Sequence, residues 1–398
     1  MGIRNSEFGI TAQPPRSPGG VGGKSEIRNP KSEISGLPSF LSLVQLVNNV
    51  VLMDYSYSNP LVPPEAVSHW LDGLSQPIAV TGGTGFVGSH LVDTLCAAGI
   101  EPRVLVRNPD EPRWIADAPV RWVVGSLDDT QALERLVDGA GTVVHLAGVL
   151  RAGREIDFDM GNRVGTSNVV SAMREVAGSA RLVHVSSLAG AGPSPTPDGI
   201  GPEVDPAPIS WYGRSKLGAE REAQAWEGDG GWVVLRPPAI YGPRDSDVFE
   251  FFRMASRGLV ALPGGERWLT VAWVGDIVRS ILAATAAQTG SLYHLGEPDP
   301  LLLDDLIAKL CDAGEVRARV VRVPPALVSG AGAIGSALQR LGWRRLALTS
   351  DKSRELLARH WTARTSDSLE ALGIKASMPF HEGAAEAWLW YRNQGWLR

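Results

Sequence analysis

Residues 78–98, IAVTGGTGFVGSHLVDTLCAA, decide the fold. They begin with a short run typical of a buried strand, continue through a glycine-rich turn and end with apolar residues at helical spacing. Glycines permit a tight turn and a close approach of the backbone to a diphosphate, and the amino end of the following helix attracts the anion. A strand, a glycine turn and a helix in this order predict a dinucleotide-binding βαβ unit.

Two glycine patterns overlap in this turn. Gly83, Gly85 and Gly88 fit GxGxxG, whereas Gly82, Gly85 and Gly88 fit the TGxxGxxG variant. Either pattern brings the whole turn against a pyrophosphate. The residues expected to bind it are Thr81, Gly82, Gly83, Thr84, Gly85, Phe86, Val87 and Gly88.

Downstream of Pro77, short β-branched runs alternate with helical patterns. This alternation is typical of the α/β class with a doubly wound parallel sheet, or Rossmann fold, whose ligands lie at the carboxyl ends of the strands. The expected strands are Ile78–Thr81, Arg103–Arg107, Arg121–Val124, Thr142–Leu146, Arg181–Ser186 and Trp232–Arg236. The expected helices are Gly88–Ala98, Asp129–Val137, Asn162–Val176 and Tyr212–Ala225.

The sequence divides into three expected parts. Residues 1–70 form an N-terminal extension that is disordered or results from an upstream start, with Met53 as an alternative initiator. Residues 71–243 form the NAD(P)-binding Rossmann domain. Residues 244–398 form a smaller α/β substrate lobe that is interleaved with the Rossmann domain, with room for a further sheet strand near 271–296.

Composition excludes several classes of protein. With 44% hydrophobic and 20% charged residues and a net charge of −5, the chain has an ordinary globular composition without the basic stripe of a nucleic-acid-binding protein. Cys96 and Cys311 are too few and too far apart for a disulfide framework or a metal site. The longest apolar run, Phe40–Met53, is shorter than the roughly 20 residues of a membrane-spanning helix. We therefore expect a cytoplasmic protein without a bound metal or a membrane span.

Two polar residues at strand ends bear on the cofactor. Arg107 follows the second strand, where a site that prefers NAD would carry Asp or Glu. An arginine there pairs with a 2′-phosphate, which favours NADP(H) over NAD(H); the alternative is an arginine that is simply solvated. Asp128 follows the third strand and either contacts the adenine or caps the next helix.

The spacing of Tyr212 and Lys216 suggests proton transfer. Four residues apart, they share one face of a helix, and a lysine ammonium lowers the pKa of a nearby phenol from about 10. Such a phenol exchanges a proton with a substrate oxygen while hydride moves to or from nicotinamide, and Lys216 would also hold the ribose hydroxyls. Ser187, or alternatively Ser186, would donate a hydrogen bond to that oxygen. Asn162 is either a supporting hydrogen-bond residue or a simple helix cap.

Taken together, these motifs resemble the extended short-chain dehydrogenase/reductase family, which also contains the NAD-dependent epimerases and dehydratases. The resemblance spans residues 77–300 and rests on TGGTGFVGSHL, HLAG at 145–148, NRVGTSNVV at 162–170, VSS at 185–187, YGRSK at 212–216 and LRPPAIYGPRD at 235–245. It implies a Ser-Tyr-Lys catalytic set at Ser187, Tyr212 and Lys216, a small C-terminal substrate lobe and a homodimer. Residues implied to border the cofactor are Leu146, Ala147, Gly148 and Pro237.

Within that family the chain is most similar to the dihydroflavonol-reductase and 3-beta-hydroxysteroid-dehydrogenase type. Dehydratases of the family carry an acidic pair after the strand-end hydroxyl residue, whereas Leu188 and Ala189 follow Ser187 here. The segment AWVGDI at 272–277 departs from the family pattern of a His or Tyr with two acidic residues, because only Asp276 remains. This departure leaves the docking of the second lobe open.

We therefore expect an oxidoreductase that transfers hydride between NADP(H) and a ketone or secondary alcohol of a moderately bulky small molecule. The alternatives are an NAD-dependent nucleotide-sugar epimerase and a non-catalytic NAD(P)-binding sensor. Arg244 and Arg267 would meet a diphosphate in the epimerase. An apolar pocket, or else the core, would contain Trp211, Tyr241, Phe249, Phe252 and Trp268.

Overall fold

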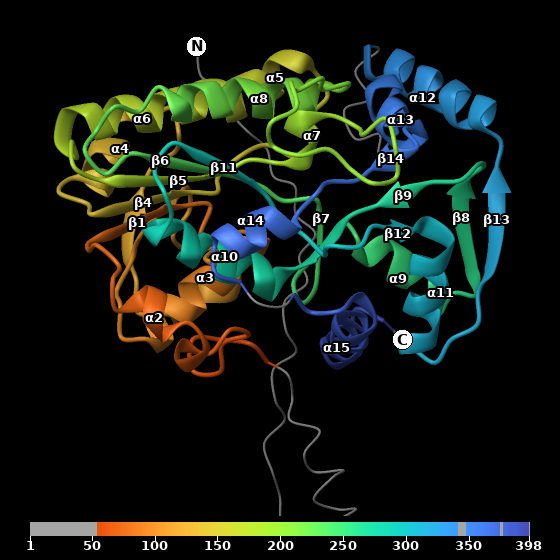
Figure 1. The fold of residues 1–398 in the computed structure, drawn as a ribbon, viewed down its shortest axis with the longest axis horizontal. Helices are drawn as coiled ribbons and strands as arrows, with labels where there is room; N and C mark the ends of the chain where they lie inside the picture. Colours follow the sequence, from red (N-terminus) through yellow and green to blue (C-terminus); the bar gives the residue numbers. More distant parts are fainter. Residues whose placement is uncertain (1–53, 341–347, 375–376, 398) are drawn as a thin grey trace, which may run out of the picture.

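The computed structural model describes residues 54–340, 348–374 and 377–397. Its centre is a parallel sheet of seven strands in the order β11-β6-β5-β4-β1-β2-β3 (Figure 1). The strands are β1 (Ile78–Thr81), β2 (Arg103–Val106), β3 (Arg121–Val124), β4 (Thr142–His145), β5 (Arg181–Val185), β6 (Trp232–Arg236) and β11 (Ser291–His294). The expected doubly wound α/β fold is confirmed, and each of the six expected strands ends within one residue of its predicted position. The seventh strand, β11, pairs with β6.

Helices cover both faces of the sheet (Figure 1). One face carries α3 (Phe86–Ala97) and α10 (Val274–Ala286), and the other carries α4 (Thr130–Val137), α6 (Gly165–Val176) and α8 (Trp211–Gln224). Leu91 of α3 and Ile281 of α10 are fully buried in one hydrophobic cluster, while Leu133 of α4 and Met173 of α6 are fully buried in another. The sheet is therefore buried on both sides, which is why its central strands are mostly apolar.

In the described part of the second lobe there are three small sheets and six helices. Its strand pairs are β7 (Ala239–Tyr241) with β10 (Val271–Trp273), β8 (Leu259–Pro263) with β13 (Arg319–Val323), and β9 (Trp268–Leu269) between β12 (Leu301–Leu302) and β14 (His360–Trp361). Its helices are α9 (Phe249–Ser256), α11 (Leu303–Ala313), α12 (Pro325–Arg340), α13 (Ser350–Leu357), α14 (Ser366–Ala371) and α15 (Phe380–Asn393). Between β10 and β12 the chain returns to the large sheet through α10 and β11.

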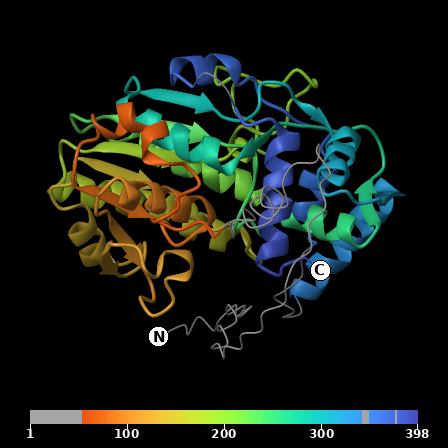
Figure 2. The ribbon, with the colours of Figure 1, turned by 90° about the horizontal axis from the view of Figure 1, so that it is seen from below.

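Helix α15 joins the two parts of the molecule. Figure 2 shows it between the large sheet region and the outer part of the second lobe. Trp388 and Trp390 of this helix are buried, and the Trp390 ring lies 5.6 Å from the ring of Trp114 in the large sheet region. The Trp388 ring lies 5.4 Å from that of Phe252 in the second lobe. The terminal tryptophans therefore form a shared core between the lobes.

The structure corrects the expected extent of the N-terminal extension. Residues 54–70 include a 3-10 turn at Pro64–Ala66 and the start of α2 (Ser68–Leu71), and Val62 and Val67 are buried in the core beside α3. The hydroxyl of Thr94 donates to the carbonyl oxygen of Val62 over 3.0 Å. Single apolar anchors separated by prolines give no periodic signal, so the sequence pattern missed this packing. The expectation for residues 1–53, Met53 included, lies outside the described residues.

Among the described residues, no helix combines the length and the apolar character needed to cross a membrane.

Candidate active site

Three glycines of the turn between β1 and α3 stand where a side chain would not fit. Gly82 has a φ of 74°, and a Cβ atom there would lie 2.7 Å from the backbone nitrogen of Ala147. A Cβ atom at Gly88 would lie 2.2 Å from the carbonyl oxygen of Gly82, and one at Gly83 would lie 2.8 Å from Cγ1 of Val104. The turn is thus packed against both α3 and the end of β4, which leaves its outer side for a ligand.

Three side chains join the glycine turn to the neighbouring strand and helix. Thr81 Oγ1 lies 2.6 Å from Nδ1 of His145 and accepts a hydrogen bond from the backbone nitrogen of Ala147. Nε2 of His145 lies 2.9 Å from Oγ1 of Thr166, which itself donates to the carbonyl oxygen of Asn162. Burial lowers the pKa of His145 to about 3, so the ring is neutral. Since Thr166 uses its proton on Asn162, Nε2 of His145 is the donor and Nδ1 accepts from Thr81.

Asn162 lies inside a continuous helical stretch, in a π-helical turn at Met160–Val164. Its side chain accepts from the backbone nitrogen of Val149 at 2.6 Å and donates to the oxygen of the same residue at 3.0 Å. It also donates to Ser215 Oγ at 2.8 Å, and Ser215 donates to the carbonyl oxygen of Tyr212 at 2.7 Å. Asn162 therefore does not cap a helix; it connects the loop after β4 to α8.

The Ser187 side chain lies close enough to Tyr212, at the carboxyl end of β5, to oppose a rise in the pKa of the phenol. Burial raises the pKa of Tyr212 to about 12, and the nearby Ser187 hydroxyl opposes this only in part. The structure thus differs from the expectation that Lys216 lowers this pKa. The reason is that burial dominates, and that the Lys216 ammonium is directed to the carbonyl oxygen of Val185, 2.9 Å away. Burial lowers the pKa of Lys216 itself to about 8.

The two serines after β5 have different partners. Ser186 is buried and donates to Glu220, which forms a buried ion pair with Arg236 at 2.6 Å. Ser187 faces Tyr212 and accepts a hydrogen bond from the backbone nitrogen of Ala189 at 3.2 Å. Of the two alternatives from the sequence, Ser187 is therefore the one that lies beside the phenol.

The remaining expected cofactor residues lie along the same edge of the sheet. Thr84, Phe86 and Val87 belong to the glycine turn and the start of α3, and Leu146, Ala147 and Gly148 directly follow β4. Pro237 directly follows β6, is buried and accepts a hydrogen bond from the backbone nitrogen of Leu188 at 2.8 Å. The carboxyl ends of β1, β4, β5 and β6 thus bring together residues from four separate sequence motifs.

Arg107 and Asp128 lie farther along this edge, after β2 and β3, and both are exposed. Asp128 accepts a hydrogen bond from Ser126. The residue that caps α4 is Asp129, whose Oδ1 accepts from the backbone nitrogen of Ala132 at 3.0 Å. The capping alternative for Asp128 is therefore wrong.

The two arginines considered for a diphosphate have structural partners. Arg244 is buried, donates to Asp93 Oδ2 at 2.7 Å and lies over the Trp114 ring at 5.4 Å. Arg267 is also buried and donates to four backbone carbonyl oxygens, among them that of Gly264 at 2.7 Å. Arg244 is thus held by a buried carboxylate and Arg267 by backbone oxygens.

The aromatic candidates also divide into core and surface. Tyr241 and Phe252 are fully buried in the core of the second lobe, and the Phe249 ring lies 4.7 Å from that of Tyr391. These three pack the core, whereas Trp211 and Trp268 are partly exposed.

The open question of lobe docking is answered by Asp276. This residue accepts from the backbone nitrogen of Met378 at 2.7 Å and pairs with Arg279 at 2.6 Å. One carboxylate thus holds the segment that leads into α15.

Sequence reasoning missed Asp351, which lies on α13 in the second lobe. Both of its carboxylate oxygens accept from the backbone nitrogen of Trp211, at 3.0 and 3.1 Å, and so cap the helix that carries Tyr212 and Lys216. The residues are 140 positions apart, and no local pattern marks the contact. Ser210, which caps the same helix through Gly213, was recognisable as a serine directly before a helical pattern.

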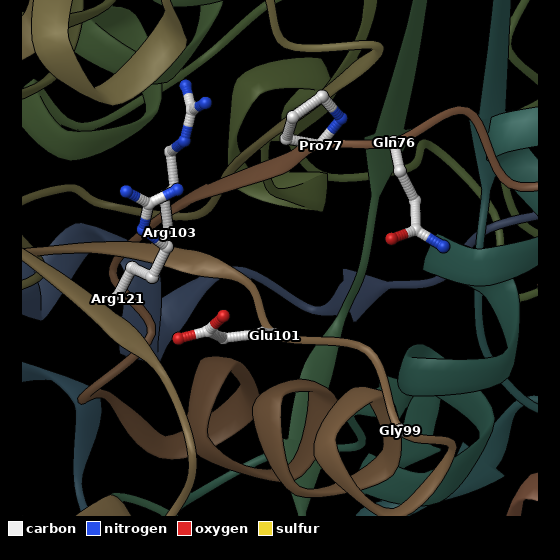
Figure 3. Close-up of a pocket in the computed structure, with 6 residues that line it drawn as sticks. All are labelled: Gln76, Pro77, Gly99, Glu101, Arg103 and Arg121. Atoms are coloured by element: carbon white, nitrogen blue, oxygen red, sulfur yellow. The ribbon is translucent and has the colours of Figure 1, made fainter.

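A separate polar hollow lies at the opposite edge of the sheet (Figure 3). It is lined by Gln76, Pro77, Gly99, Glu101, Arg103 and Arg121. Arg103 and Arg121 are the first residues of β2 and β3, so this hollow lies at the amino ends of the strands and is distinct from the glycine turn.

Comparison with known proteins gives the family. A model of the NAD dependent epimerase/dehydratase family matches residues 78–296. The chain belongs to this family. It is 32% identical to a ceramide reductase of Caulobacter vibrioides over 80% of this chain and 96% of the relative. It is 26% identical to a 4-hydroxy-2-methyl-3-oxo-4-farnesyl-3,4-dihydroquinoline-1-oxide ketoreductase of Stigmatella aurantiaca over 77% of this chain and 97% of the relative.

Solved structures of the epimerase/dehydratase family have the same fold. The Thermus thermophilus UDP-glucose 4-epimerase in complex with NAD superimposes with a TM-score of 0.62 at 23% identity, over 79% of this chain and 98% of the epimerase. The chain is thus an NAD-dependent enzyme of this family. Because its relatives include reductases, epimerases and dehydratases, family membership alone leaves the reaction open.

Proposed function

We propose that this enzyme is a reductase that transfers hydride between NADP(H) and a ketone or secondary alcohol of a bulky, largely apolar small molecule. The observation that carries the proposal is the contact between Ser187 and Tyr212 at the carboxyl edge of the sheet, with Lys216 beside them. The glycine turn at the same edge would hold the cofactor pyrophosphate.

The bound nicotinamide supplies the hydride. Because its pKa is about 12, Tyr212 is protonated at neutral pH and serves as the proton donor in the reducing direction. When hydride adds to the carbonyl carbon of a ketone, the π electrons of the C=O bond move to the oxygen, which becomes an alkoxide. An alkoxide is a stronger base than a phenolate, so proton transfer from Tyr212 to this oxygen is downhill. Ser187 donates a hydrogen bond to the same oxygen and stabilises the charge that develops there.

The charged groups around the site support a reductase over a nucleotide-sugar epimerase. Arg244 and Arg267 are bound to Asp93 and to backbone carbonyl oxygens, respectively. The residues after Ser187 are apolar, so this position supplies no acid and base for water elimination. The ceramide reductase and the ketoreductase, which the chain matches over nearly their full length, are named for reductions.

Arg107 supports the choice of NADP(H). Its exposed guanidinium follows β2, the strand next to the one that leads into the glycine turn. A 2′-phosphate on the adenosine ribose is the group that an arginine at this position would bind. A cytoplasmic homodimer remains our expectation for the assembled enzyme, and light scattering of the purified protein tests the dimer.

The test is NADPH oxidation with a panel of long-chain, steroidal and aromatic ketones, alongside incubation with UDP-sugars without added cofactor. We expect NADPH to be consumed with at least one ketone class. Tyr212→Phe should lower kcat by roughly 10²- to 10⁴-fold while NADPH binding stays within a few-fold of the wild type. Purification with tightly held NAD and conversion of a UDP-sugar would instead establish the epimerase. Unchanged turnover in Tyr212→Phe would refute the catalytic assignment.

A further inference from the structure

Helix α12 presents an apolar face to the outside of the molecule. Leu327 and Ile334 are each 64% exposed and lie seven residues apart, so they are on the same side of the helix. Residues 325–339 contain no charged side chain at all. The exposed positions between and beside the two large residues are small: Ser329, Gly330, Ala331, Ala333 and Ala337. An exposed helix of this composition is unusual on a surface that faces only water.

The opposite face of α12 fixes this orientation. A Cβ atom at Gly332 would lie 1.9 Å from Oγ of Ser353, and one at Gly335 would lie 2.0 Å from the carbonyl oxygen of Leu348. Ser353 on α13 also donates to the carbonyl oxygen of Val328 over 3.2 Å. Because glycines set so close an approach, the helix cannot roll to bury Leu327 and Ile334 without losing its contact with α13.

The sequence around α12 is strongly basic. Residues 316–350 contain six arginines and no aspartate or glutamate, although the whole chain has a net charge of −5. Three of these arginines precede the helix and are exposed: Arg317, Arg319 and Arg322. Figure 1 shows β13, which carries Arg319 and Arg322, leading directly into α12 at the same edge of the molecule. Arg322 pairs with Asp304.

We propose that α12 and the arginines of residues 317–322 form a surface that binds an anionic lipid membrane. An apolar helix face beside a cluster of cations suits a bilayer whose headgroups carry phosphate, since the side chains insert among the acyl chains while the arginines remain at the headgroups. A second copy of the chain fits less well, because a two-fold contact through this face brings the same basic segment of both copies together. The proposal does not depend on the reaction proposed above.

The experiment is co-sedimentation of the full chain with phosphatidylcholine vesicles, with and without phosphatidylglycerol. We expect binding to be roughly tenfold or more stronger when phosphatidylglycerol is present, and to weaken as salt is added. The double variant Leu327→Glu with Ile334→Glu should lose roughly tenfold or more of this binding. The matched control is Ile156→Glu, because Ile156 on α5 (Glu155–Asp159) is a helical isoleucine that is 52% exposed. The control should bind vesicles like the wild type.

The substituted residues are exposed, so thermal unfolding of each variant should match that of the wild type. Absence of binding to phosphatidylglycerol vesicles, or equal loss in the double variant and in Ile156→Glu, would overturn the proposal. The proposal would also be overturned if ultracentrifugation showed a dimer for the wild type and a monomer for the double variant while neither protein bound vesicles. NADPH binding is measured on the same samples, so a failed membrane proposal is distinguished from a failed cofactor assignment.

Discussion

The Nζ atom of Lys216 donates a hydrogen bond to the carbonyl oxygen of Val185 over 2.9 Å. Val185 is the last residue of β5, two positions before Ser187. The bond therefore ties the helix that carries Tyr212 to the strand that carries Ser187. It also places a buried cation at the strand end, and burial lowers its pKa to about 8.

Replacing Lys216 should change how stability depends on pH. The pKa of Lys216 falls from its ordinary 10.5 to about 8 on folding, so the folded state disfavours the proton. The stabilising contribution of this group is present above pH 10.5 and is lost as the pH falls through about 8. A pKa change of this size corresponds to roughly 3 kcal/mol. As the pH falls from alkaline to neutral, we expect the free energy of unfolding of the wild type to decrease more than that of Lys216→Met.

Urea unfolding at a series of pH values measures this difference. Parallel pH profiles for the two proteins would contradict the assignment of the lowered pKa to Lys216. Cofactor titration of the same variant provides a second readout, because Lys216→Met should also weaken NADPH binding if the ammonium holds the ribose hydroxyls.

Ser186→Ala and Ser187→Ala should have opposite effects. Ser186 donates to the buried Glu220, so its removal should cost roughly 1–3 kcal/mol of stability and change kcat little. Ser187 contacts Tyr212, so its removal should lower kcat by roughly 10²-fold and leave NADPH affinity unchanged. Thermal unfolding and steady-state kinetics of both variants check the pair. If Ser186→Ala lowered kcat more than Ser187→Ala did, the catalytic role would belong to Ser186 and the assignment would be wrong.

Gly88→Ala should disrupt the cofactor turn. The added methyl group would lie 2.2 Å from the carbonyl oxygen of Gly82, so α3 and the turn must separate. We expect NADPH affinity to fall by more than about tenfold and stability to fall by roughly 1–3 kcal/mol. Gly178→Ala is the control, because a Cβ atom there would have no neighbour within 4 Å. Isothermal titration with NADPH would contradict the prediction if both variants bound equally.

Arg107→Ala should reduce the preference for NADPH. Loss of a charge-assisted hydrogen bond to the 2′-phosphate corresponds to roughly 10- to 100-fold in affinity, and NADH lacks that phosphate. Arg121→Ala is a suitable control, because Arg121 is an exposed arginine at the opposite end of the neighbouring strand (Figure 3). The measurement is the dissociation constant of each nucleotide for both variants. We expect only one of the four to differ from the wild type, that of NADPH with Arg107→Ala. Equal losses for NADPH and NADH would indicate that Arg107 does not read the 2′-phosphate.

The large sheet and the glycine turn were predictable because their signals are local. Strands buried on both faces are continuous apolar runs, and the turn at Thr81–Gly88 combines a strand, glycines and a helix within a few residues. Tyr212 and Lys216 were recognisable for the same reason, since one helical turn separates them. The positions of these elements agree with the structure to within a few residues.

Contacts between distant segments were not predictable in this way. Arg244 and Asp93 are 151 residues apart, and either would pass for a solvated charge in the sequence. The high pKa of Tyr212 depends on burial, which helical spacing does not report. The choice between Ser186 and Ser187 required the position of Glu220, and Glu220 shows no pattern that marks it as buried.

The buried pair of Glu220 and Arg236 limits how this part of the sequence can diverge. Changing either residue alone leaves a buried charge without its partner, at a cost of roughly 3–5 kcal/mol, whereas replacing both with well-packed apolar residues can be neutral. Ser186 donates to the same carboxylate and belongs to the same unit. Distant descendants of this protein should therefore keep all three polar groups or exchange them together, and intermediates with one change should be rare.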